Sequence, residues 1–225
     1  MKLFSFRGIS VIATKGWFIF VALMSLFFSL SHSESAIDCL LALTISAIMI
    51  SFVFCLVVAH EFGHALTAQK LGYEVEKIYL IPFGGLAEIK GNFGKTPKHE
   101  LLITAMGPAV NLALVAVLWP IYYLLPQPAE HTLYHSACVI LSLTIKTNVV
   151  LFLFNMIPCY PMDGGRFLRA LLALKFGIKH ATKYAFYCSA ALGIPLAIWG
   201  FFNGYLVGLV FPFLLATAYV ETKQY

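Results

Sequence analysis

The sequence between residues 53 and 64 reads Val-Phe-Cys-Leu-Val-Val-Ala-His60-Glu61-Phe62-Gly63-His64, an apolar run that ends in ionisable side chains. On a helix, residues four apart lie one turn apart on the same face, so His60 and His64 can both reach one metal ion. Two imidazoles and a third ligand hold Zn²⁺ with one position open for water, and Glu61 is placed to take a proton from that water. The apolar setting predicts that this metal site lies within a lipid bilayer.

The composition is that of an integral, multi-pass membrane protein. Of 225 residues, 60% are hydrophobic and 11% are charged, and the mean hydropathy is +0.86. Soluble domains have roughly 45–50% apolar and about 25% charged residues. A bilayer core of about 30 Å needs roughly 20 apolar residues per helix. We therefore expect one transmembrane domain over residues 1–225, with spans at about 14–31, 37–66, 100–125, 137–157, 183–202 and 204–220.

The basic residues alternate from one connection to the next. They precede the first expected span, lie between the second and third and between the fourth and fifth, and follow the sixth. The connections 31–38 and 126–136 contain no Lys or Arg. Because basic residues stay cytoplasmic, this distribution predicts six crossings with both termini in the cytoplasm. It also accounts for the net charge of +5, so we expect no nucleic-acid partner.

A short β-ribbon is expected between the second and third spans. Gly72 ends the helix, and residues 73–90 place aliphatic residues on both sides of Pro82-Phe83-Gly84-Gly85. This pattern is typical of a hairpin or bent ribbon. Its unpaired edge could bind an extended peptide, and an ordinary amphipathic surface hairpin is the alternative.

The fourth span is expected to end in a broken helix. Two prolines stop it in the sequence Asn155-Met-Ile-Pro-Cys-Tyr-Pro-Met-Asp163-Gly-Gly, and a helical pattern resumes over 167–176. Irregular backbone at membrane depth persists where it lines a cavity. A carboxylate there needs a partner, and a metal bound by His60 and His64 would provide one for Asp163.

Two further asparagines lie inside expected spans. Asn111 follows a Gly107-Pro108 pair, which serves either close helix packing or the shape of a cavity. Asn148 precedes Asn155 by seven residues, so the two share a helix face. We expect Asn111 and Asn148, together with Gly84 and Gly85, to contact substrate. The five cysteines form no C-x-x-C pair, which favours buried apolar roles.

The whole pattern resembles the site-2 protease family of intramembrane zinc metalloproteases. The resemblance rests on four motifs, which are His60-Glu61-x-x-His64, Gly84-Gly85, Gly107-Pro108-x-x-Asn111 and Asn155-x-x-Pro158-x-x-Pro161-x-Asp163-Gly164. Pro82-Phe83-Gly84-Gly85 is similar to the compact branch that includes sporulation-type pro-sigma-factor-processing enzymes.

The resemblance implies roles for these residues. His60, His64 and Asp163 would bind one Zn²⁺, and Glu61 would act as general base and then as proton donor to the leaving amine. Asn155 would bind the oxyanion or orient the substrate, and the Gly84-Gly85 ribbon would contact an unwound substrate helix. The implied reaction is hydrolysis of a peptide bond in a transmembrane protein substrate, near the cytoplasmic face of a prokaryotic cell membrane.

The chain also departs from that family, and other interpretations exist. No PDZ or CBS domain is expected, so regulation would come from a partner, such as a membrane-bound regulator, or from another site, unless the chain is truncated. A prenyl-peptide-processing type of protease would need a distant glutamate as third ligand, and Glu88, Glu100 and Glu130 lie in or near loops. A catalytically silent scaffold with a structural zinc site would have no use for Glu61. A transporter is disfavoured because no internal repeat is visible.

Overall fold

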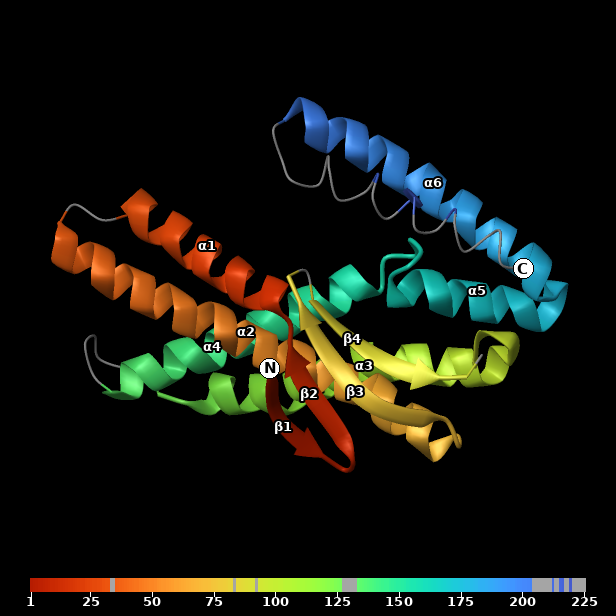
Figure 1. The fold of residues 1–225 in the computed structure, drawn as a ribbon, viewed down its shortest axis with the longest axis horizontal. Coiled ribbons are helices and arrows are strands. Elements are labelled where there is room, and N and C mark those ends of the chain that lie inside the picture. Colours follow the sequence, from red (N-terminus) through yellow and green to blue (C-terminus); the bar gives the residue numbers. More distant parts are fainter. Residues whose placement is uncertain are drawn as a thin grey trace. The chain divides into compact units, whose positions relative to one another are not determined.

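The computed structural model describes residues 1–32, 35–82, 84–91, 93–126 and 133–203, together with residues 212, 215, 216 and 219. The helices in these ranges are α1 (Lys15–His32), α2 (Ala36–Lys70), α3 (Pro97–Leu124), α4 (Leu133–Asn155), α5 (Asp163–Phe176) and α6 (Ile178–Phe202). The strands are β1 (Lys2–Phe6), β2 (Ile9–Ala13), β3 (Glu74–Ile81) and β4 (Gly84–Lys90), and a short 3-10 helix covers Phe93–Lys95 (Figure 1).

The chain forms two compact units. The first contains Met1–Lys90 and Val110–Val149, and the second contains Gly91–Ala109 and Val150–Tyr225. Helices α3 and α4 each contribute residues to both units. The expectation of one domain over the whole chain stays a prediction.

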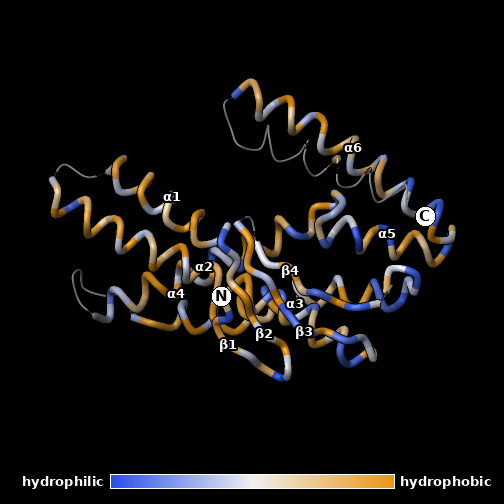
Figure 2. Tube along the Cα trace, viewed as in Figure 1, coloured by the Kyte–Doolittle hydropathy of each residue, from blue (hydrophilic) through white to orange (hydrophobic). Residues whose placement is uncertain are grey.

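Long apolar helices dominate the part of the chain that the structure describes. Four of them have the length and composition to cross a membrane, namely α2, α3, α4 and α6, and their traces are mostly hydrophobic in Figure 2. They correspond to the second, third, fourth and fifth expected spans. Helix α1 covers the first, but its apolar helix Lys15–Ser31 is shorter than the other four. The sixth, 204–220, lies almost entirely outside the described residues, so six crossings stay a prediction.

The sheet is larger than the sequence analysis expected. The ribbon over 73–90 is confirmed as the antiparallel pair β3–β4. Strands β1 and β2 form a second hairpin, and β2 pairs in parallel with β3, so the strand order is β1-β2-β3-β4. The hairpin turn consists of Arg7 and Gly8, both with positive φ, as a type I′ turn requires. This N-terminal segment, interpreted above only as a basic flank, is therefore a structural part of the first unit.

The sheet has a buried and an exposed face. Ile9, Val11 and Ala13 alternate along β2 and are fully buried. On β3, Val75, Ile78 and Leu80 are buried, and α2 packs against β3 and β4. This side-chain alternation, which is the signature of a half-buried strand, holds the ribbon next to the segment of α2 that carries the histidines.

The predicted break after the fourth span is confirmed. Helix α4 ends at Asn155, and helix α5 begins at Asp163, one turn before the expected restart. The glycines that follow Asp163 are required by close packing. A Cβ on Gly164 would lie 2.5 Å from two main-chain oxygens, and one on Gly165 would lie 2.3 Å from the Tyr160 nitrogen. Any side chain there would push α5 away from the turn that precedes it.

Candidate metal centre and active site

Helix α2 brings His60 and His64 together in the first unit. The two residues are one turn apart, and they are only 4% and 7% exposed. Their Nε2 atoms are 3.1 Å apart. Both ring nitrogens therefore point at one place, which is the geometry that the i, i+4 spacing predicts.

The histidine pair fits a zinc ion. Two nitrogen ligands at about 2.0–2.1 Å from a tetrahedral ion are about 3.3 Å apart. The observed 3.1 Å separation is close to that value. At this distance a single hydrogen can lie between the two Nε2 atoms, and a metal ion would take the place of that hydrogen.

The other nitrogen of His60 is held by a chain of amides. Its Nδ1 lies 2.5 Å from Oδ1 of Asn111 on α3. The Asn111 Nδ2 donates to Oδ1 of Asn148 on α4 at 2.8 Å, and the Asn148 Nδ2 donates to the Thr144 carbonyl at 2.8 Å. Both asparagines are fully buried. Their expected contact with substrate stays a prediction, but the structure places their amides behind His60.

Glu61 is held by strand β4. Its Oε2 accepts a hydrogen bond from the Ala87 backbone N–H at 3.1 Å. Gly85 leaves the space in which this side chain lies, because a Cβ on Gly85 would be 2.4 Å from the Glu61 Cγ. The expected contact of Gly84 and Gly85 with substrate stays a prediction. In the structure, the missing side chain of Gly85 also leaves the space that the Glu61 side chain occupies.

The remaining predicted site residues belong to the second unit. Asp163 is the first residue of α5 and follows the cap residue Met162. Asn155 is the last residue of α4, and its Nδ2 donates to the Leu151 carbonyl at 3.0 Å. The irregular segment 156–162 thus separates the two polar residues along the chain.

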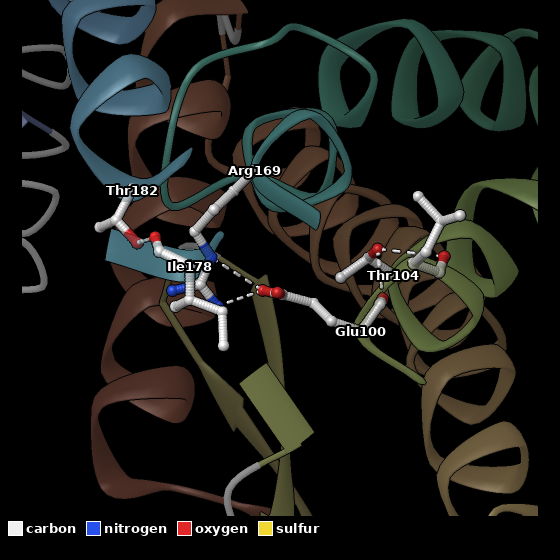
Figure 3. Close-up of polar contacts among 6 residues, drawn as sticks. Glu100, Thr104, Arg169, Ile178 and Thr182 are labelled. Carbon is white, nitrogen blue, oxygen red and sulfur yellow. Dashed lines mark hydrogen bonds and ion pairs between the residues drawn. The ribbon is translucent and has the colours of Figure 1, made fainter. Parts of the chain in front are cut away.

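A buried ion pair in the second unit was not foreseen. Figure 3 shows Arg169 of α5 with its guanidinium directed at the carboxylate of Glu100 on α3. The Arg169 Nε donates to the Glu100 Oε1 at 3.1 Å, Nη2 donates to the same oxygen, and both side chains are at most 3% exposed. Arg169 also lies over the Tyr160 ring, 5.5 Å from its centroid. Glu100 is therefore paired with Arg169, which disfavours it as a third zinc ligand in addition to its place near a loop.

The other two alternative ligands are placed differently. Glu88 lies on the exposed face of β4, where the Tyr79 hydroxyl donates to its carboxylate at 3.4 Å. Glu130 lies outside the described residues. Glu88 thus has the position of a surface residue of the sheet.

Four described helices are long and apolar enough to cross a membrane, and one of them, α2, carries a His-Glu-x-x-His motif whose histidines converge. These two features define a class of membrane proteins with a metal-binding motif on a helix. The sequence profile of Peptidase family M50 matches residues 48–137 and 125–196. The chain belongs to this family, which is the site-2 protease family of zinc metalloproteases.

Individual relatives agree with that assignment. The structure is similar to the solved site-2 protease from Methanocaldococcus jannaschii, with a TM-score of 0.66, 28% identity, and coverage of 99% of this chain and 94% of the other. The zinc metalloprotease MJ0392 of the same organism is 36% identical over 68% of this chain and 43% of its own length. Stage IV sporulation protein FB of Bacillus subtilis is 25% identical over 75% of this chain and 57% of its own. The chain thus spans about half the length of these curated relatives.

Proposed function

We propose that this protein is an intramembrane zinc metalloprotease that hydrolyses a peptide bond in or near a transmembrane segment of a membrane-protein substrate. The observation that carries the proposal is the convergence of the His60 and His64 Nε2 atoms with Glu61, their neighbour on α2, fixed by β4. A structural zinc site needs closed coordination and no base. An ordered carboxylate between two ligands is the arrangement of a hydrolytic site.

We propose Asp163 as the third ligand, with zinc as the metal. One type of catalytic zinc site combines two histidines with a carboxylate and keeps a fourth position open. Relatives of this chain carry the name zinc metalloprotease, which favours zinc. When bound, zinc lowers the pKa of water to about 7 and polarises a substrate carbonyl. The tight turn at Gly164 and Gly165 supports the proposal because it would give the Asp163 carboxylate a fixed place at the start of α5.

Glu61 is proposed as the general base and later as the proton donor. The Ala87 N–H binds one carboxylate oxygen, so the carboxylate has a defined orientation and its other oxygen can accept a proton. After the peptide bond breaks, the same oxygen would return that proton to the leaving amine. Both steps need the carboxylate in one place, which the contact with Gly85 helps to define.

Asn155 is proposed to bind the developing oxyanion. One N–H of its amide donates to the Leu151 carbonyl, and an amide group has two such hydrogens. The second N–H can therefore donate to substrate without loss of the first bond. A side chain anchored in this way meets the requirement that an oxyanion donor be positioned before the reaction.

The outer edge of β4 is proposed as the place where substrate lies in an extended conformation. Alternate residues of an antiparallel strand direct their N–H and C=O groups away from the partner strand. Ala87 is one of these, since its N–H reaches Glu61 and not β3. A helical substrate must unwind before its peptide bonds can be attacked. Apart from the Ala87 N–H, which is bound to Glu61, the outward backbone groups of β4 would offer hydrogen bonds to the unwound segment. Gly84 and Gly85 begin that edge and would let the substrate approach closely.

The same proposal includes the position of the protein in the membrane and a further partner. The lipid bilayer would enclose the long apolar helices, and the alternating basic connections would place both termini in the cytoplasm. A membrane-bound regulator is proposed as a further partner, because an intramembrane protease must be restrained from unselective cleavage.

The test is co-expression with candidate single-span substrates, followed by gel shift and metal analysis. The variant Glu61→Gln should lose cleavage and keep wild-type zinc, because it removes the base and neither histidine. The matched control is Glu88→Gln, an exposed glutamate of β4, which should cleave normally. Zinc-loaded wild-type protein with no activity on any helical substrate would contradict the proposal and favour the silent scaffold.

A further inference from the structure

The hydrogen bonds that link His60 to Asn111, Asn148 and Thr144 can run in only one donor-to-acceptor order, because the chain ends at a backbone carbonyl. The Thr144 carbonyl oxygen can only accept, so the Asn148 atom that lies 2.8 Å from it must be the amide nitrogen. The Asn148 oxygen is then the atom that faces Asn111. Asn111 must present its own nitrogen to that oxygen, at 2.8 Å.

The direction passes on to the histidine. With its nitrogen bound to Asn148, Asn111 presents its oxygen to the His60 Nδ1 at 2.5 Å. A carbonyl oxygen accepts and cannot donate, so Nδ1 must carry a hydrogen. In a neutral imidazole the other nitrogen, Nε2, then carries the lone pair. Nε2 is also the atom that lies 3.1 Å from the His64 Nε2.

We propose that Asn111 and Asn148 form a directional hydrogen-bond relay that sets the tautomer of His60 and presents its Nε2 lone pair to the metal. Thr144 provides the fixed starting point, since its carbonyl belongs to α4 and cannot reverse. The two asparagines are positioning residues that act through His60. The tautomer of His60 is inferred from the three hydrogen bonds. The role of that tautomer in metal binding rests on the proposed function.

The reversed relay would be incompatible with metal binding. If both amides turned over, the Asn148 oxygen would face the Thr144 oxygen, and Asn111 would offer an N–H to Nδ1. His60 would then carry its proton on Nε2, with no lone pair there for a metal. Both asparagines are 0% exposed, so no water at their surface would compensate a reversed amide. The backbone of α4 thus favours the tautomer that can bind zinc.

Simple interhelical packing is the competing account, because buried asparagines also hold membrane helices together. The two accounts differ in what they predict when the side chain of residue 111 has two identical ends. An aspartate has two equivalent oxygens, so in Asn111→Asp either one can accept from Nδ1. The anchor at Asn148 then becomes unnecessary for the tautomer. Packing alone predicts no such dependence between the two positions.

The experiment measures zinc affinity by chelator competition in the purified full chain. Asn111→Leu should weaken zinc binding 10- to 100-fold, the usual loss when the partner of a metal-bound histidine is removed. Asn148→Leu should weaken it more than threefold, whereas the double variant Asn111→Asp/Asn148→Leu should bind within threefold of wild type. Equal weakening by Asn148→Leu in both backgrounds, or none in either, would overturn the relay.

A second measurement needs no metal and is made on the wild-type protein. Nitrogen NMR of histidine-labelled, zinc-free wild-type protein in bilayers, assigned with His60→Gln, should place the His60 proton on Nδ1. A proton on Nε2 would overturn the relay whatever the zinc affinities are. A proton on Nδ1 in a protein that binds no zinc would support the relay and contradict the proposed function, so the two failures are distinguishable.

Discussion

Gly85 offers a sharp test of how Glu61 is held. In Gly85→Ala the new Cβ would lie 2.4 Å from the Glu61 Cγ and 3.0 Å from its Cδ, whereas ordinary contacts begin near 3.4 Å. The Glu61 side chain must therefore move by about 1 Å. It can do so by rotation, so the fold survives, but the carboxylate leaves the Ala87 N–H. Misplacement of a catalytic group by about 1 Å can cost about 100-fold in rate, or about 2.7 kcal/mol of activation free energy.

The assay is steady-state cleavage of a reconstituted single-span substrate, with zinc content measured on the same samples. The value of kcat should fall about 100-fold while zinc stays at the wild-type level, since no proposed ligand is touched. Leu86→Ala is the control, because Leu86 is the next residue of β4 and its side chain is 56% exposed. A wild-type kcat in Gly85→Ala would refute the reasoning. A change confined to KM would also refute it, and would assign Gly85 to substrate contact alone.

Three further predictions concern the folded structure. Glu100→Gln leaves the Arg169 guanidinium buried without its counter-charge, so it should lower the free energy of unfolding by about 3–5 kcal/mol in denaturant titrations, and Glu100→Gln/Arg169→Met should recover part of that loss. Gly165→Ala should reduce zinc content and folded yield together, because its Cβ would lie 2.3 Å from a backbone nitrogen. The hydrogen bond from Lys90 holds the pKa of Glu76 below its ordinary value of 4.5. The small stability advantage over Lys90→Met should therefore be present above that ordinary value and be lost as the pH falls through the folded pKa of Glu76, which thermal melts across the acid range would detect.

The parts of the fold that a single sequence predicted are those with a local signal. The spacing of His60 and His64 follows from one helical turn, and the break before Asp163 follows from two prolines and two glycines. The β3–β4 hairpin connects adjacent segments through a short turn. Each of these depends on residues close together in the chain, so composition and periodicity suffice to find them.

The N-terminal hairpin shows where such signals fail. Its alternation over Ile9–Ala13 is visible in the sequence, and Arg7-Gly8 is a usable turn. What fixes β2 is its parallel pairing with β3, from Ser10 opposite Lys77 to Ala13 opposite Leu80. That pairing crosses two helices, and nothing local predicts it. The basic residues of this segment also had a sufficient explanation in membrane topology, which concealed their structural role.

The groups that hold His60 and Glu61 in place were also difficult to predict from the sequence. A polar side chain inside an apolar span must find a partner, so the burial of Asn111 and Asn148 could be expected. Which partner each chooses depends on how α2, α3 and α4 pack, and the same residues could equally have faced substrate. The donor that holds Glu61 is a backbone N–H of an alanine, which leaves no trace in a sequence. Gly85 does leave one, because only glycine fits beside the Glu61 side chain. A glycine opposite a catalytic carboxylate can thus be required by the catalytic residue itself, even where the pattern first suggests that it makes room for substrate.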